Sequence, residues 1–73
     1  MNIYAKPGSR VVFSHPNNGY PGDQKNAQRH LQVGHTYTVE RTEVHSFSTR
    51  VFLQEVPGTF FNSVLFEDAK NGQ

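Results

Sequence analysis

The chain contains no cysteine, no tryptophan and no long apolar run. Without cysteine, neither a disulfide nor a thiolate metal site can form, and this composition fits a reducing compartment. No stretch of about 18 apolar residues is present, so the sequence predicts no membrane-spanning helix. Residues 1–7 lack the apolar segment of a secretory signal. We therefore expect a soluble cytoplasmic protein.

Charge is also scarce. Seven Lys and Arg nearly balance six Asp and Glu, and the formal net charge is +1. This is too little to produce a strong phosphate-binding field over the whole molecule. The 73 residues predict a single domain, 1–73, and a chain this short buries only about 60% of its unfolded surface. Six Phe and three Tyr supply much of that burial, and this aromatic content argues against disorder.

Short alternating segments predict a mostly β protein. Residues 9–15, 35–44 and 49–56 are the predicted strands. The second alternates apolar and polar side chains, which is typical of a strand with one buried face, whereas the first and third carry apolar side chains on both faces. The turn signal Pro57-Gly58 follows the third of these strands and leads into Phe60-Phe61. The residues predicted to fill the interior are Val11, Phe13, Tyr37, Val39, Val51, Leu53, Phe61, Val64 and Phe66.

A loop and a short helix separate the first two predicted strands. Proline, asparagine and glycine dominate residues 16–22, which predicts an irregular loop. Asp23 is a good N-cap, and residues 24–31 can form two helical turns that end before Gly34. A helix this short must pack against the rest of the protein to be stable.

The end of the chain predicts a change of direction. Asn62-Ser63 favours a side-chain-to-backbone hydrogen bond, so we expect a single 3₁₀ turn there. Residues 64–66 are predicted to form the last strand, and residues 69–73 to fray.

This order of elements resembles the SH3-like small barrels. The segment 61–66, with the sequence FNSVLF, is similar to the 3₁₀ turn and closing strand of those folds. The resemblance implies a small antiparallel barrel of about five strands with one short helix in the first long loop. Because the chain has no tryptophan and no acidic, aromatic-rich first loop, recognition of proline-rich peptides is not carried over.

Two longer segments resemble short uncharacterised proteins encoded by bacteriophage and bacterial genomes. They are residues 33–46, VGHTYTVERTEVHS, and residues 55–67, EVPGTFFNSVLFE. The resemblance implies a small accessory protein of a bacterial cell or an infected host cell, and it implies no active site.

The sequence gives little support for catalysis. No Gly-x-Ser-x-Gly segment is present, and a barrel of this size is filled by its own side chains. We expect no enzyme activity, no cofactor and no small-molecule substrate. The four histidines lack the spacing of a zinc site, and exposed positions near turns are the favoured interpretation. Whether they converge on a metal stays open; they are His15, His30, His35 and His45.

Some apolar side chains remain after the interior is filled. Val12 and Phe52 are either exposed or covered by the helix through Ala27 and Leu31. Aromatic side chains on loops of a rigid frame are typical anchors of protein contacts. We therefore predict a protein-binding surface that contains Tyr20, Phe47, Phe52 and Arg50.

Nucleic-acid binding is the alternative. Small barrels often bind nucleic acids, and exposed aromatic rings stack on bases at about 1–3 kcal/mol per base. The scattered basic residues and their near balance with acids argue against it. The residues predicted for this alternative are Arg10, Lys25, Arg29 and Arg41.

Overall fold

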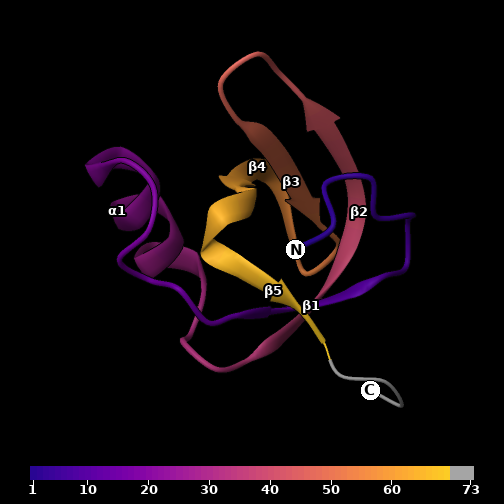
Figure 1. Ribbon diagram of the computed structural model, residues 1–73. Coiled ribbons are helices and arrows are strands. Elements are labelled where there is room, and N and C mark those ends of the chain that lie inside the picture. The colour runs from indigo at the N-terminus through magenta and orange to yellow at the C-terminus, as the bar shows by residue number, and fades with distance from the viewer. Residues whose placement is uncertain (70–73) are drawn as a thin grey trace.

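Five antiparallel strands form one sheet in the order β4-β3-β2-β1-β5, and one helix lies beside it (Figure 1). The computed structural model describes residues 1–69. The strands are β1 (Arg10–Phe13), β2 (Thr36–Val44), β3 (Thr49–Leu53), β4 (Val56–Asn62) and β5 (Phe66–Asp68), with helix α1 (Pro21–His30) between β1 and β2 and the 3₁₀ helix η1 (Ser63–Leu65) between β4 and β5. The prediction of a mostly β protein with one short helix in its first long loop is confirmed.

The closed barrel implied by the resemblance to SH3-like folds is not confirmed. β4 and β5 lie at opposite ends of the strand order, and no ladder joins them within residues 1–69. The chain itself connects the two edges through η1, and β5 then crosses the molecule to lie along β1 (Figure 1).

Other segments contact the backbone of both edge strands of the sheet. At the β4 edge, Asn26 of α1 donates a hydrogen bond from Nδ2 to the carbonyl oxygen of Phe60 at 2.9 Å. At the β5 edge, the amino group of Met1 donates to the carbonyl oxygen of Phe66 at 3.1 Å. Covered edges offer fewer free backbone groups to a second chain.

The strand alternation places the core as predicted in β1 and β3. Val11 and Phe13 are fully buried, and so are Val51 and Leu53. Phe66 packs between two other rings, with centroids 6.0 Å from Phe13 and 6.3 Å from Phe61. The buried core is Val11, Phe13, Ala27, Leu31, Val39, Val51, Leu53, Phe61, Leu65 and Phe66, with Tyr37 partly buried against it.

The helix begins earlier than the sequence predicts. α1 starts at Pro21 with Tyr20 as its N-cap, so the prediction that Asp23 is the N-cap is wrong. Proline is compatible with this position because the first helical N–H has no partner within a helix. Asp23 lies in the first turn instead, where Oδ2 accepts the backbone N–H of Tyr20 at 3.0 Å.

The predicted turn at Pro57-Gly58 is also wrong. Gln54 and Glu55 form the turn, and Pro57 and Gly58 lie inside β4. The pairing register between β3 and β4 shifts in this stretch, and Gly58 has a positive φ of 88°. β4 is an edge strand, where proline and an irregular backbone cost little ladder pairing. The strong turn signal therefore marks a bulge.

The end of the chain differs from the prediction by one element boundary. The expected 3₁₀ turn is confirmed, and Asn62 Oδ1 accepts the N–H of Val64 at 3.2 Å. However, residues 63–65 all belong to η1, so the last strand begins at Phe66 and not at Val64. The tighter helical turn directs Val64 outward, 45% exposed, and buries Leu65 completely. The assignment of Val64 to the interior is wrong.

Strand boundaries are otherwise narrower than predicted. β1 covers residues 10–13 of the predicted 9–15, and β3 ends at Leu53. The backbone N–H of Ala69 donates to the carbonyl oxygen of Arg10 at 3.0 Å, which continues the contact between β5 and β1. The remainder of the predicted frayed tail, residues 70–73, lies outside the described residues.

Candidate partner-binding groove

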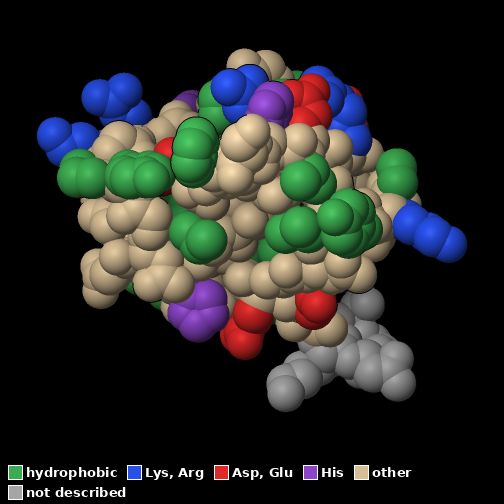
Figure 2. All heavy atoms as spheres, turned by 45° about the horizontal axis from the view of Figure 1, so that its top comes forward, with side chains coloured by type: hydrophobic (Ala, Val, Ile, Leu, Met, Phe, Trp, Pro, Cys, Tyr) green, Lys and Arg blue, Asp and Glu red, His purple; other side chains and the backbone are tan. Residues whose placement is uncertain are grey.

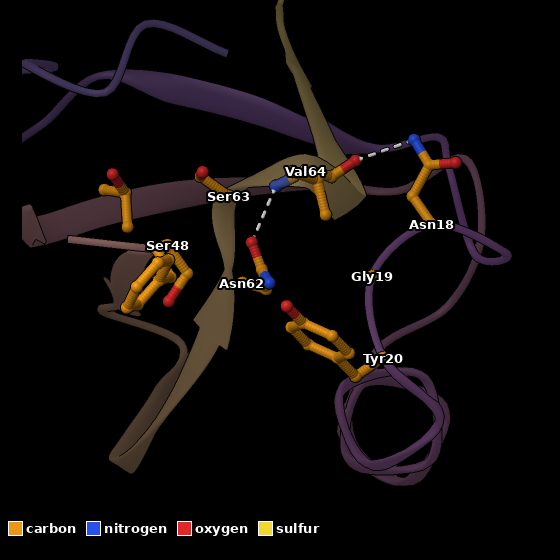
Figure 3. A pocket seen from close by; sticks show the side chains of 9 residues that line it. Asn18, Gly19, Tyr20, Ser48, Asn62, Ser63 and Val64 are labelled. Carbon is orange, nitrogen blue, oxygen red and sulfur yellow. Dashed lines mark hydrogen bonds between the residues drawn. The ribbon is translucent and has the colours of Figure 1, made fainter. Parts of the chain in front are cut away.

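An open groove of about 560 Å³ lies between the loop before α1, the turn from β2 to β3, and η1 (Figure 3). Its volume falls in the range of about 300–1,000 Å³ that is usual for ligand sites. Aromatic and aliphatic side chains form its rim, and hydroxyl and amide groups complete the lining. The lining residues are Asn18, Gly19, Tyr20, Phe47, Ser48, Thr49, Asn62, Ser63 and Val64.

Two of the four residues predicted for partner binding meet at this groove. Tyr20 is 67% exposed and Phe47 is 94% exposed, and they come from loops on opposite sides of β2 in the sequence. In Figure 3 the Tyr20 hydroxyl points toward Asn62 across the groove. The structure thus brings together two loop aromatics that the sequence placed only separately.

Hydrogen bonds fix the loop that carries Tyr20. Asp23 Oδ2 accepts from the backbone N–H of Tyr20 and from Asn62 Nδ2, at 3.0 and 3.1 Å. Asn18 Nδ2 donates to the carbonyl oxygen of Val64 at 3.1 Å, as Figure 3 shows. Gly19, between these contacts, has a φ of 80°, a conformation that side chains disfavour. The rim is therefore tied to η1 and β4.

Sequence reasoning missed the floor of the groove. Thr49 and Ser63 are 5% and 7% exposed, yet both line the groove. Neither hydroxyl bonds to another residue within residues 1–69, and neither is among the buried polar atoms that lack a partner in this range. Ser and Thr occur throughout the chain, so only the close approach of β3 to η1 distinguishes these two.

Phe52 and Arg50 lie elsewhere, on the outer face of the sheet. The guanidinium of Arg41 stacks 3.7 Å above the Phe52 ring, and that of Arg50 stacks 4.4 Å above Phe60. The ring centroids of Phe52 and Phe60 are 5.8 Å apart. Phe52 is half-buried beneath these neighbours, while Ala27 and Leu31 join the interior core. We call Arg41, Phe52, Phe60 and Arg50 the arginine–phenylalanine cluster.

The basic residues of the nucleic-acid alternative lie on three elements. Arg10 is on β1, Lys25 and Arg29 are on α1, and Arg41 is on β2. Arg41 also forms an ion pair with Glu43. Hydrogen bonds from Arg41 and then from His45 lower the pKa of Glu43, which keeps this carboxylate charged. On the face of the molecule that Figure 2 shows, basic side chains lie at separate places, and acidic side chains lie among them at the upper edge.

The histidines occupy different surroundings. His45 Nε2 lies 3.4 Å from Glu43 Oε1, and the His30 ring packs edge-on against Phe61 with centroids 6.2 Å apart. In residues 1–69, no three His, Cys, Asp or Glu side chains lie close enough together to hold a metal ion. No helix in the same range is long and apolar enough to cross a membrane.

These features define a class: a small antiparallel β protein with one short helix, whose loops and 3₁₀ turn form an uncharged aromatic groove. The family model for Bacteriophage T4 protein Y07B matches residues 2–73, and the chain belongs to this family. The predicted resemblance to short bacteriophage proteins is thereby confirmed, and the family supports an accessory role in a phage. Comparison with curated proteins gives no match, and neither does comparison with solved structures.

Proposed function

We propose that this chain is a non-enzymatic interaction module of a bacteriophage, which binds another protein through the groove. The observation that carries the proposal is the convergence of Tyr20 and the almost fully exposed Phe47 on one groove. Large aromatic side chains dominate the binding energy of many interfaces. The Tyr20 backbone N–H donates to Asp23, and the Asn18 side chain donates to the backbone of Val64. These hydrogen bonds hold the Tyr20 loop in place, which lowers the ordering cost of binding.

The chemistry of the lining favours binding over turnover. Within residues 1–69, no carboxylate, histidine, lysine or arginine side chain lines the groove. Acid–base catalysis needs such a group within hydrogen-bond reach of the reacting atom. The groove offers neutral hydroxyl and amide groups instead, which orient a ligand without exchanging protons at neutral pH.

Affinity capture from lysates of phage-infected bacteria tests the proposal. The bait is the tagged wild-type chain, compared with a Tyr20→Ala/Phe47→Ala double variant. Tyr4→Ala is the matched control, because Tyr4 is 73% exposed but does not line the groove. We expect the wild type and Tyr4→Ala baits to recover the same partner protein in equal amounts. The double variant should not recover it. Equal recovery by all three baits would contradict binding through the groove.

The arginine–phenylalanine cluster supports a second candidate, binding of single-stranded nucleic acid. Phe60 is 41% exposed, and the guanidinium of Arg50 lies beside it. An exposed ring beside a cation suits a base and its phosphate. A gel-shift titration at two salt concentrations tests this candidate, because phosphate contacts make the affinity fall steeply with salt. No shift at low salt would eliminate it.

A further inference from the structure

We propose that the occupant of the groove is a short uncharged peptide segment. Its apolar side chain lies between Tyr20 and Phe47, and its main chain hydrogen bonds to the hydroxyls of Thr49 and Ser63. This inference rests on the proposed function and specifies the chemistry of the partner.

The floor of the groove supplies the first argument. The Thr49 and Ser63 residues are more than nine-tenths buried, but their hydroxyls are not among the buried polar atoms that lack a partner within residues 1–69. Both hydroxyls line the groove and form no hydrogen bond to another residue in this range. A hydroxyl that lines a groove and has no partner in the protein is available to a ligand that supplies a donor or an acceptor. A peptide main chain offers one donor and one acceptor at almost every residue. A peptide segment in the groove can therefore offer hydrogen bonds to these hydroxyls.

The absence of charge from the lining supplies the second argument. Among the described residues 1–69, none of the side chains that line the groove is ionisable at neutral pH. Asp23 supports the rim from behind, and its Oδ2 already accepts two hydrogen bonds. A charged side chain that enters the groove loses hydration and gains no opposite charge. The groove therefore selects an apolar side chain over a charged one.

The covered edges of the sheet supply the third argument. Peptides often bind β proteins as an added strand, which requires an open edge. Here Asn26 contacts the backbone of β4, and the amino group of Met1 contacts the backbone of β5. These contacts occupy one backbone carbonyl of each edge strand and oppose strand addition there, which favours binding in the groove.

Amide chemical shifts of the ¹⁵N-labelled chain, titrated with capped tripeptides, test the inference. The probes are acetyl-Gly-Phe-Gly-amide, acetyl-Gly-Glu-Gly-amide and acetyl-Gly-Lys-Gly-amide, at up to about 10 mM because ligands this small bind weakly. We expect only the phenylalanine peptide to shift the amides of Ser48, Thr49, Ser63 and Val64 in a saturable way. Equal effects of all three peptides, shifts confined to other surfaces, or no shifts at all would overturn the inference.

Variants separate hydrogen bonding from shape. Thr49→Val keeps the side-chain volume and removes the hydroxyl. We therefore expect it to raise the dissociation constant of the phenylalanine peptide about fivefold. Ser48→Ala is the control, because Ser48 also lines the groove but is only half-buried. Unchanged binding by Thr49→Val would remove the hydrogen bonds from the inference.

The inference and the proposed function can fail separately. Loss of a captured protein in the Tyr20→Ala/Phe47→Ala variant, together with no peptide binding, leaves the groove as an interface and overturns the peptide inference. A further titration with methyl glucoside tests another neutral ligand. Shifts of the groove amides with the glucoside and not with the phenylalanine peptide would overturn the inference in favour of a saccharide.

Discussion

Asn62 Nδ2 donates a hydrogen bond to Asp23 Oδ2 at 3.1 Å, and this contact ties α1 to the end of β4. The same carboxylate oxygen accepts the backbone N–H of Tyr20 at 3.0 Å. One side chain thus connects the helix, the sheet and the aromatic rim of the groove. The hydrogen bond to Asp23 helps to fix the backbone position of Tyr20.

Substitution of Asp23 tests this connection. Asp23→Ala removes both hydrogen bonds, and we expect the free energy of unfolding to fall by about 1–3 kcal/mol. Asp23→Asn keeps a side-chain oxygen that can accept both hydrogen bonds, so its free energy of unfolding should fall less. Urea denaturation of the two variants measures the difference. Equal losses would show that charge at the helix start matters more than this hydrogen-bond geometry.

Gly19 gives a second test of the rim. Its φ of 80° disfavours other residues, and an added Cβ would lie 3.1 Å from Asp23 Oδ2 and 3.4 Å from Val64 Cγ2. We expect Gly19→Ala to lower the free energy of unfolding by about 1–2 kcal/mol. The matched control is Gly22→Ala in α1, where nothing lies within 4 Å of the added Cβ. Gly22→Ala should be neutral or stabilising, because alanine favours helix. Equal destabilisation by both variants would contradict this account.

The arginine–phenylalanine cluster predicts an energetic coupling across β3 and β4. A double-mutant cycle of Arg50→Gln and Phe60→Leu should give a coupling energy of about 0.5–1 kcal/mol, because the Arg50 guanidinium stacks on the Phe60 ring. The control cycle pairs Phe60→Leu with Arg10→Gln, since Arg10 lies on β1. Its coupling energy should be near zero. Thermal unfolding of the variants supplies both values, and equal coupling in the two cycles would contradict a specific stacking contact.

Glu55 predicts a dependence of stability on pH. Burial opposes its ionisation, but the Thr38 backbone N–H donates to both carboxylate oxygens, at 2.8 and 3.1 Å, and holds the pKa of Glu55 below its ordinary value of 4.5. Because the folded chain has the lower pKa, this stabilisation is present above the unfolded pKa and lost as the pH falls through the folded pKa. We expect Glu55→Gln to be less stable at neutral pH and to lose less stability on acidification. Parallel acid denaturation curves for wild type and Glu55→Gln would contradict this prediction.

Local patterns predicted the strands because burial follows the alternation of side chains. Val11, Phe13, Val51 and Leu53 alternate with polar or half-buried residues and fill the core as expected. Pro57-Gly58 misled the prediction because the local signal for a turn is the same as that for an irregular edge strand. Only the pairing partner of β4 distinguishes the two.

The groove was only partly predictable. Tyr20 and Phe47 were recognised as loop aromatics, but their meeting depends on η1, which turns Val64 outward and Leu65 inward. Thr49 and Ser63 carry no distinguishing local pattern, because their burial results from tertiary packing. Phe52 and Arg50 were predicted to belong to the same surface as the loop aromatics, but the strand register and the stacking of arginine on phenylalanine place them on another face.

Photo-crosslinking in phage-infected bacteria tests the central claim most directly. A benzophenone amino acid replaces Phe47 in one variant and Tyr4 in another, and both positions are strongly exposed. The account predicts a discrete crosslinked partner protein from position 47 and none from position 4. Crosslinking from position 4 but not from position 47, or from neither, would contradict a protein-binding groove at Phe47.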